Sequence, residues 1–454
     1  MESNNLEIES KPRYVFSIVF LLILWTTQSL AVGNSVKCSK GNDSKPSIVS
    51  SKSEKRHPII LLHSGWQVEN IGDIAHTPGF LALTEKHIPE AEVIFWPHYD
   101  YLPENEVQML KKRFSKLKIV RGKLSMDGVS STLELAEAIR QSDIFINNSG
   151  PATIGWAEAT AYKKSTGKPF GVYGVTYGLY GTPEKEILSE AEFVFFRDTA
   201  SLNRAKKEGI HAKVMAWGPD AAFATDVEDE TKAVAFLKEN NLEEGKFICC
   251  IPKHRMTPVW LHEHKNRSFD AVRNARNEVM KEHDHAPMIE AITAIIRQTN
   301  LKVLIVHEDE TQMSIGKDWI YDKLPEDVKP RVVWRNKGWL TDEAISIYKR
   351  SVGLFSHKQH SPIMCIGHNI PAILVRWEEQ STKGYMWNTI GLQDWLLDFD
   401  KAEDIKKYVP AVLFMAKNPA WAKAKAIKAR KFVEMKQKET MKVVRKTCLK
   451  SMKK

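Results

Sequence analysis

Cysteine is scarce in this chain, with five residues among 454. No two of them form a C-x-x-C pair, which excludes a zinc site built on paired thiolates. Cys249 and Cys250 lie in the apolar run 247–251 (FICCI), where cysteines are usually small buried hydrophobes. The H-E-x-x-H spacing of metalloproteases is also missing, and histidines two residues apart, such as His262 and His264, do not share a helix face. We therefore predict a protein without a bound metal.

Internal repeats are missing as well, since no segment recurs with a period of roughly 20–50 residues, and this excludes a solenoid. The formal net charge of +10 is concentrated at one end, because residues 417–454 hold 14 Lys and Arg against two Glu and leave the remainder at −2. This segment predicts basic C-terminal helices that are either solvated or attracted to anionic lipid. It has few aromatic side chains for base stacking and no known binding motif, so nucleic acid is not an expected partner.

One long hydrophobic run lies near the N-terminus. Residues 14–25 (YVFSIVFLLILW) are uncharged and follow Lys11 and Arg13, and residues 29–31 (SLA) resemble a signal-cleavage site. A cleaved signal and a retained anchor remain alternatives; we expect the anchor, which would make the chain a single-pass membrane protein. Basic residues lie on both sides of the run, so the side of the membrane stays open. The Ser- and Lys-rich residues 33–56 predict a flexible stem.

Beyond the stem, short apolar runs alternate with longer mixed segments, which is typical of βαβ units. An acidic stretch, residues 226–230 (DVEDE), separates two such series. We therefore predict two doubly wound, Rossmann-like α/β domains facing each other across a cleft. The predicted parts are 1–32 (anchor or signal), 33–56 (stem), 57–225 and 226–400 (the two α/β domains) and 401–454 (basic C-terminal helices). The expected strands are 59–62, 92–96, 117–120, 144–146, 170–173, 193–196, 214–217, 247–251, 302–306, 331–334, 352–355 and 372–375, and the clearest helices are 132–140, 200–208, 287–299 and 341–349.

The most informative segment is residues 355–371 (FSHKQHSPIMCIGHNIP), which follows the expected strand 352–355. It places Lys358 and His360 directly after a strand and before a short buried helix that Gly367 ends. Open α/β sheets bind ligands at the carboxyl ends of their strands, so these side chains would face a crevice. A cationic cluster in that position favours an anionic substrate.

Four further segments carry glycines, amides or charged groups at strand ends. Gly72 would let backbone amides approach an anion at a helix start. The guanidinium of Arg197 can hold a phosphate or carboxylate with two hydrogen bonds. The segments are 70–75 (NIGDIA), 142–150 (SDIFINNSG), 168–178 (KPFGVYGVTYG) and 192–201 (EFVFFRDTAS), the last followed by Gly209 and 218–220 (GPD).

Together these five segments resemble the polysaccharide pyruvyl transferase family over about residues 58–400. Residues 70–75 are similar to the family's N-x-G-D-x-A segment, and 192–201 to its R-D-x-x-S succession. Residues 360–371 are similar to its H-x-x-I-x-A-x-x-x-g-x-P element. The chain departs from the family at Lys358, where Arg is usual, and at Ser149, in a loop usually made of glycines. Lysine keeps the positive charge but loses the bidentate fork, so it would bind phosphate as a point charge.

The resemblance implies a GT-B-like transferase that moves pyruvate from phosphoenolpyruvate onto hydroxyls of a glycan or lipid-linked sugar, forming a ketal. Phosphoenolpyruvate is then the donor substrate, and no cofactor is expected. By the resemblance, His360 and Arg197 are catalytic. The expected substrate-binding residues are Lys358, Lys383, Asn70, Gly72, Asp73, Ser149 and Asp220.

The chemistry agrees with these residue types. Phosphoenolpyruvate carries a phosphate and a carboxylate, so its site needs several cationic donors in a partly dry cleft, which Arg197, Lys358 and Lys383 can supply. Ketal formation moves protons to the methylene carbon and from the attacking hydroxyls, and an imidazole such as His360 suits that role. Acidic residues such as Asp73 could equally cap a helix or orient a donor.

Two other functions stay open. The same architecture and cationic cleft would suit the diphosphate of a nucleotide-sugar, which is the donor of a GT-B glycosyltransferase. A membrane-tethered glycan-binding protein that has lost catalysis is the second alternative, suggested by Lys358 and by the altered glycine loop around Ser149.

Overall fold

The structure is a computed structural model that describes residues 56–177, 183–262 and 265–452. Residues 56–454 form one unit. The expected anchor or signal (1–32) and nearly all of the stem (33–56) lie outside the described residues, so membrane attachment stays a prediction. Within the described ranges, no helix combines the length and the apolar character that crossing a bilayer requires.

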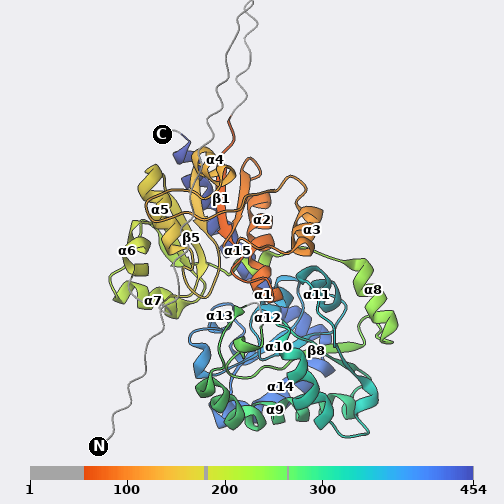
Figure 1. The fold of residues 1–454 in the computed structure, drawn as a ribbon. Coiled ribbons are helices and arrows are strands. Elements are labelled where there is room, and N and C mark those ends of the chain that lie inside the picture. The colour runs from red at the N-terminus through yellow and green to blue at the C-terminus, as the bar shows by residue number, and fades with distance from the viewer. Residues whose placement is uncertain (1–55, 178–182, 263–264, 453–454) are drawn as a thin grey trace, which may run out of the picture. The chain divides into compact units, whose positions relative to one another are not determined.

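The N-terminal domain is built on a seven-stranded parallel sheet with the strand order β3-β2-β1-β4-β5-β6-β7 (Figure 1). Strand β1 pairs with β2 on one side and with β4 on the other. The sheet therefore reverses its winding between β1 and β4, which is where doubly wound sheets open a crevice. The strands are β1 (Ile59–Ser64), β2 (Glu92–Pro97), β3 (Lys118–Ile119), β4 (Ile144–Asn147), β5 (Phe170–Val175), β6 (Phe193–Phe196) and β7 (Met215–Trp217).

The second domain repeats this plan with six parallel strands in the order β10-β9-β8-β11-β12-β13. Its winding reverses between β8 and β11, so its crevice also opens at the carboxyl ends of the strands. The two parallel-sheet α/β domains confirm this part of the sequence prediction. The strands are β8 (Phe247–Ile251), β9 (Lys302–Ile305), β10 (Val332–Trp334), β11 (Leu354–Ser356), β12 (Ala372–Arg376) and β13 (Leu396–Asp398).

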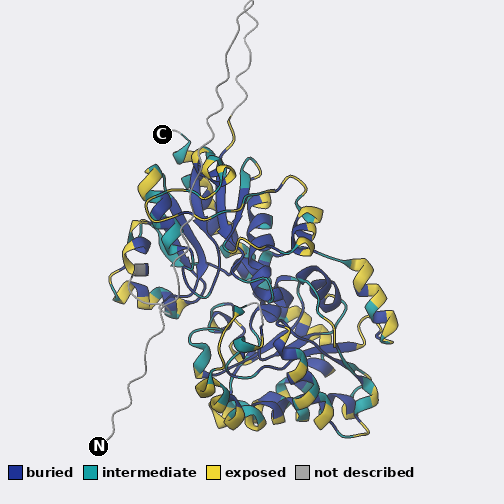
Figure 2. Cartoon of the chain, in the orientation of Figure 1, coloured by how far each residue is buried: buried dark blue, intermediate teal, exposed yellow. Residues whose placement is uncertain are grey.

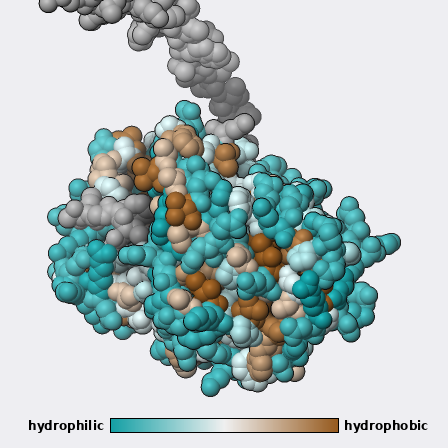
Figure 3. Space-filling view, turned by 90° about the horizontal axis from the view of Figure 1, so that it is seen from below, coloured by the Kyte–Doolittle hydropathy of each residue, from teal (hydrophilic) through white to brown (hydrophobic). Residues whose placement is uncertain are grey.

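Helices cover both sheets, and the buried residues gather in the strands while exposed residues lie on the outer helix faces (Figure 2). The face shown in Figure 3 is mainly hydrophilic, with apolar groups interrupted by polar ones. Scattered exposed apolar side chains of this kind are normal on folded proteins. The helices are α1 (Ile71–Ile74), α2 (His76–His87), α3 (Glu104–Arg113), α4 (Leu133–Gln141), α5 (Trp156–Thr166), α6 (Pro183–Glu190), α7 (Thr199–Lys207), α8 (Glu230–Glu239), α9 (Ala271–Gln298), α10 (Thr311–Ile315), α11 (Thr341–Tyr348), α12 (His360–Gly367), α13 (Met386–Thr389), α14 (Ala402–Lys417) and α15 (Pro419–Ser451).

The last helix, α15, returns from the second domain and packs against the first (Figure 1). Its Thr440 hydroxyl hydrogen-bonds the Tyr173 hydroxyl at 3.0 Å, and its Arg445 pairs with Glu90 at 2.6 Å. One face of this basic helix is therefore part of the core, while lysines occupy its outer face.

Two elements differ from the sequence prediction. The helix expected at 287–299 is α9, which begins 16 residues earlier, at Ala271, and contains Pro287 in its interior. A proline suits the first turn of a helix, so the sequence pattern predicts a helix that begins at Pro287. In the structure, buried side chains on both sides of Pro287 keep the helix continuous. Strand β13 was not expected, because it contains Asp398 and has further acidic residues on both sides, so its two leucines do not form a clear apolar run.

Candidate active site

A cavity of about 190 Å³ lies where residues that follow the strands of both sheets meet. The N-terminal domain contributes side chains after β1, β4 and β6, and the second domain contributes side chains after β8, β9, β11 and β12. This is the position that two facing doubly wound sheets prescribe for a ligand. The lining residues are Gln67, Asn70, Asp73, Pro151, Arg197, Lys253, Thr257, Val259, Lys265, Glu308, Asp309, Lys358, Gln359, His360, Gln380 and Lys383.

The short helix α1 lies against α12 (Figure 1), and its Asp73 lines the cavity. Asn70 caps it, because its side-chain oxygen accepts the amide of Gly72 at 2.9 Å. The Ile71 amide in turn donates to the Glu308 carbonyl at 2.9 Å, which ties α1 to the second domain. A Cβ on Gly72 would lie 2.2 Å from the Cβ of His360, so only glycine lets α1 approach the start of α12 this closely.

His360 is the first residue of α12 and is 9% exposed. Its ring lies edge-on to the ring of His76, with centroids 4.8 Å apart, and its Nδ1 is 3.9 Å from a carboxylate oxygen of Asp73. Burial, followed by the neighbouring His76 ring, holds the pKa of His360 well below its ordinary value. The imidazole is therefore neutral near pH 7.

The fully buried Asp220 stands behind this histidine pair and does not line the cavity. One carboxylate oxygen lies 3.3 Å from Nε2 of His76, and the other accepts Nη1 of Arg197 at 2.8 Å. Burial alone would raise the pKa of Asp220, but His76, Arg197 and His360 together hold it below its ordinary value. Asp220 therefore stays ionised and orients Arg197, which lines the cavity, and His76, which lies behind His360.

Arg197 is the buried cation of the N-terminal domain, with 1% exposure. Its Nε donates to the Thr176 hydroxyl at 2.8 Å and its Nη1 to Asp220. Its Nη2 is buried and has no hydrogen-bond partner among the described residues. An unsatisfied guanidinium nitrogen is costly inside a protein, so a cavity that holds one is suited to an anion.

Three lysines face Arg197 from the second domain. Lys253 is 8% exposed, and burial together with Lys358 and Lys383 holds its pKa well below its ordinary value. Burial and then Arg197 lower the pKa of Lys383 to about 8. Positive groups that lower one another's pKa gain most when a multiply charged anion binds among them.

Glu308 is the acidic partner of this lysine group and is 1% exposed. One of its carboxylate oxygens accepts the Ser361 amide, and the other lies 3.8 Å from Nζ of Lys358. Burial raises the pKa of Glu308, although Lys358 opposes that effect. Glu308 thus fixes the beginning of α12 and holds Lys358 beside the cavity.

The structure brings seven of the nine expected site residues to one place. Gly72 touches His360 from α1, while Asn70, Asp73, Arg197, Lys358, His360 and Lys383 all line the cavity. Ser149 does not line it, because its hydroxyl donates to the Tyr173 carbonyl at 3.3 Å and accepts the Ala221 amide at 3.0 Å. Asp220 acts from behind, as described above. Three residues escaped the sequence reasoning: His76, Lys253 and Glu308.

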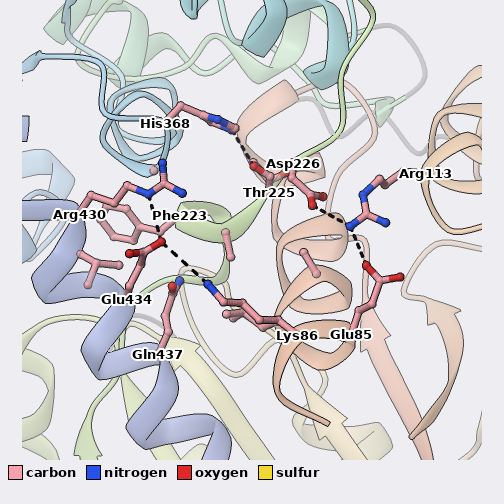
Figure 4. Close-up of a pocket in the computed structure, with 15 residues that line it drawn as sticks. Glu85, Lys86, Arg113, Phe223, Thr225, Asp226, His368, Arg430, Glu434 and Gln437 are labelled. Atoms are coloured by element: carbon pink, nitrogen blue, oxygen red, sulfur yellow. Dashed lines mark hydrogen bonds and ion pairs between the residues drawn. The ribbon is translucent and has the colours of Figure 1, made fainter. Parts of the chain in front are cut away.

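A second pocket, of about 330 Å³, is lined by residues of α2, of the segment after β7, of the end of α12 and of α15 (Figure 4). Its charges pair with one another. Arg113 binds both Glu85 and Asp226, at 2.7 and 2.8 Å, and Glu434 lies near both Lys86 and Arg430. These neutralised groups join the domains, and the pocket is less suited to an anion than the first cavity.

Two groups of described side chains have the spacing to hold a metal ion. Asp73, His76 and His360 form one of them, and two of its members, Asp73 and His360, line the cavity. The guanidinium of Arg197 acts on the same histidine and would repel a cation there. The other group, His63, His98 and Glu158, lies outside the cavity.

Comparisons with known proteins agree with this architecture. The polysaccharide pyruvyl transferase family matches residues 70–379. No curated protein matches the sequence.

Solved structures of proteins in complex with UDP or UDP-GlcNAc share the fold. UDP-GlcNAc 2-epimerase from Neisseria meningitidis bound to UDP-GlcNAc is 10% identical with a TM-score of 0.50, covering 85% of this chain and 99% of that one. HepE from Anabaena in complex with UDP is 7% identical with a TM-score of 0.50, covering 85% and 97%. TcCGT1 in complex with UDP is 12% identical with a TM-score of 0.51, covering 87% and 100%.

Such low identities show the fold alone, which is two parallel-sheet α/β domains of the GT-B-like kind. The family match covers most of the chain and includes the cavity residues from Asn70 to His360. The chain therefore belongs to the polysaccharide pyruvyl transferase family, and it is a transferase that acts on polysaccharide.

Proposed function

We propose that this transferase takes its pyruvate from phosphoenolpyruvate, bound in the 190 Å³ cavity, and joins it to two hydroxyls of a glycan or lipid-linked sugar. One observation carries the proposal: Arg197, Lys253, Lys358 and Lys383 converge on a cavity that also contains the neutral imidazole of His360. A small, multiply charged anion with an adjacent proton-transfer step needs this combination. The mechanism requires no cofactor beyond the donor.

The cations divide between the two ends of the donor. Arg197 offers Nη2, whose planar geometry suits a carboxylate or a phosphate edge. The lysine ammonium groups of the second domain act as point charges and suit phosphate. Bound anion would raise the pKa of each lysine, because the charged form gains a partner.

His360 is the proton-transfer group of the proposal. The first acceptor hydroxyl adds its oxygen to C2 of phosphoenolpyruvate, and the proton that this hydroxyl loses is transferred to C3, which becomes a methyl group. The second hydroxyl then attacks C2, the C2–O bond to phosphate breaks, and phosphate leaves with its electron pair and takes up the second hydroxyl proton. His360 accepts a hydroxyl proton and then donates it to C3 or to the leaving phosphate. It can do so because the pKa of the imidazole rises when the anionic donor binds beside it.

His76 and Asp220 support this step from behind. Asp220 fixes His76 at 3.3 Å, and the His76 ring supports the His360 ring edge-on. We expect them to act as positioning residues, since Asp220 does not reach the cavity wall.

Acceptor-dependent release of inorganic phosphate from phosphoenolpyruvate tests the proposal, with the full chain and a panel of glycosides. His360→Asn and Arg197→Lys should each lose activity by at least about 100-fold, since each removes one catalytic contact. His211→Asn and Arg204→Lys are matched controls, because both residues are exposed on the surface. The controls should keep full activity.

A contrary result is equally clear. If no glycoside causes phosphate release and phosphoenolpyruvate does not raise the melting temperature, the donor assignment is wrong. Thermal stabilisation by a nucleoside diphosphate-sugar alone would then favour a glycosyltransferase. Binding of glycan with neither donor would favour the non-catalytic alternative.

A further inference from the structure

Three metal-binding side chains meet at the carboxyl edge of the N-terminal sheet, outside the donor cavity. His63 lies on β1, His98 directly follows β2, and Glu158 lies in the first turn of α5, which follows β4. One ligand atom from each lies within 4.8 Å of the others. No spacing in the sequence reveals this group, because three separate strand ends bring it together.

The two imidazoles are held in a metal-binding arrangement. Nδ1 of His63 donates to the Trp96 carbonyl at 3.0 Å, which leaves the lone pair of its Nε2 free. Metal-bound histidines almost always anchor their other nitrogen in this way. The Nε2 atom lies 3.4 Å from Nδ1 of His98, which is long for a hydrogen bond. Two nitrogens on a tetrahedral zinc ion, each about 2.0–2.1 Å from the metal, are separated by about 3.4 Å.

Glu158 completes the group from the side of solvent. Its carboxylate oxygen lies 4.0 Å from Nε2 of His63, and the side chain is 21% exposed, so it has room to rotate toward the imidazoles. The approach of α5 requires Gly155, because a Cβ there would lie 2.4 Å from the His63 ring. The Gly155 amide is held by the Asn147 side chain at 2.9 Å.

Aromatic rings wall the site on its inner side. The centroid of the Trp96 ring lies 4.4 Å from that of the His63 ring. The centroid of the Trp66 ring lies 5.3 Å from that of His63 and 5.5 Å from that of His98. His63 is 1% exposed, so its free Nε2 is shielded on the side away from His98 and Glu158. The rings fix the imidazole planes, while the partly exposed glutamate leaves a path for an ion to enter.

We propose that Nε2 of His63, Nδ1 of His98 and a carboxylate oxygen of Glu158 bind a divalent transition-metal ion of the zinc type. Two imidazoles and one carboxylate suit such an ion, whereas Mg²⁺ and Ca²⁺ prefer oxygen ligands throughout. Three protein ligands leave a fourth coordination position for water or for a ligand hydroxyl. The site departs from the prediction of a protein without a metal, and it does not depend on the donor proposed above.

The test measures metal binding without any assay of activity. The full chain is stripped with EDTA, dialysed, and titrated with Zn²⁺ against a chromophoric chelator; Co²⁺ then replaces Zn²⁺ for visible spectroscopy. We expect one equivalent of Zn²⁺ and visible Co²⁺ bands of four-coordinate type. His98→Gln and Glu158→Gln should each weaken Zn²⁺ binding by about 100-fold and remove the Co²⁺ bands. His211→Gln and Glu134→Gln, at exposed positions, are the matched controls.

Melting temperatures in EDTA show that each variant is folded. Added Zn²⁺ should raise the melting temperature of the parent and of the two controls, but not that of His98→Gln or Glu158→Gln. The proposal is overturned if the parent binds no Zn²⁺. It is also overturned if both variants bind Zn²⁺ as tightly as the parent does, because the ion then sits elsewhere.

Discussion

Nη1 of Arg197 lies 2.8 Å from Oδ2 of Asp220, and neither side chain is more than 1% exposed. Nε of Arg197 also donates a hydrogen bond, to the Thr176 hydroxyl, so the guanidinium cannot turn. Its Nη2 is the nitrogen that remains available to a ligand. The pair therefore combines two tasks: it compensates a buried charge and it aims an anion donor. Replacing either member should affect stability and donor binding together.

Asp220→Asn tests the first of these tasks. It leaves the Arg197 charge buried without its carboxylate, and breaking a buried pair in this way costs about 3–5 kcal/mol of unfolding free energy. Urea unfolding at pH 7 measures the loss. Asp327→Asn is the control, because Asp327 pairs with Arg297 at the surface, and we expect a cost of at most about 1 kcal/mol there. Equal losses in the two variants would contradict the role of burial.

Gly72→Ala tests the contact between α1 and α12. The added Cβ would meet the Cβ of His360 at 2.2 Å, so either helix must shift and His360 must move. A displacement of about 1 Å at a reacting group costs about 100-fold in rate, and we expect kcat to fall at least that far.

Two double variants separate this collision from a general loss of stability. Combining Gly72→Ala with His360→Gly should recover unfolding free energy relative to Gly72→Ala alone, because the opposing Cβ is gone. Combining it with His360→Ala should not, since alanine keeps the Cβ. Recovery in both, or in neither, would place the strain elsewhere.

Much of the fold could be read from the sequence, since parallel strands buried on both faces are short continuous apolar runs such as 59–62 and 302–306. His360 and Lys358 were found because they directly follow a strand, where the chain itself dictates proximity to the crevice. His76 was missed, because it lies on α2 and reaches the site only through packing. Its one signal was its place three residues after Asp73, just beyond the N-x-G-D-x-A segment.

Other parts of the site depend on contacts between segments that lie far apart in the sequence, which no local pattern encodes. Lys253 follows strand β8 with no motif to mark it, yet it is buried beside Lys358 and Lys383. Ser149 was expected at the substrate because its segment resembles a glycine-rich segment of the family, but its hydroxyl joins β5 to the segment after β7. Such long-range partners become visible only when the sheets are assembled.

The pKa of Lys383 predicts how donor use depends on pH. Burial, followed by Arg197, lowers that pKa to about 8, so the free enzyme loses this positive charge as pH rises through about 8. We expect kcat/KM for phosphoenolpyruvate to fall about tenfold per pH unit above that value, since kcat/KM reports groups of the free enzyme. Initial rates between pH 6.5 and 10 measure the profile, with the range chosen to extend about two units above the pKa.

Lys383→Arg should remove this fall, because a guanidinium stays charged throughout that range. Lys206→Arg, at an exposed position on α7, should leave the profile of the parent unchanged. A fall near pH 8 that persists in Lys383→Arg would assign the titration to another group.

Glu106 on α3 predicts a stabilising substitution. It is 1% exposed, and neither carboxylate oxygen has a hydrogen-bond partner among the described residues. Burial, followed by the charge of Glu69, raises its pKa from 4.5 to about 8. At pH 7 the folded protein therefore holds a proton that the unfolded chain has released, and stability falls as pH rises from about 4.5 to about 8. The difference amounts to about 3 kcal/mol at pH 7.

Glu106→Gln replaces the protonated acid with a neutral side chain of the same shape in both states, so the penalty disappears. We expect urea unfolding at pH 7 to show a gain of about 2–3 kcal/mol in the free energy of unfolding. At pH 4.5 we expect no such gain, because the acid is already protonated in the folded state and half protonated in the unfolded one. Glu104→Gln, two residues earlier and on the exposed face of α3, should change stability by less than about 0.5 kcal/mol. A gain of equal size at both pH values would mean that packing, and not the buried proton, sets the stability at this position.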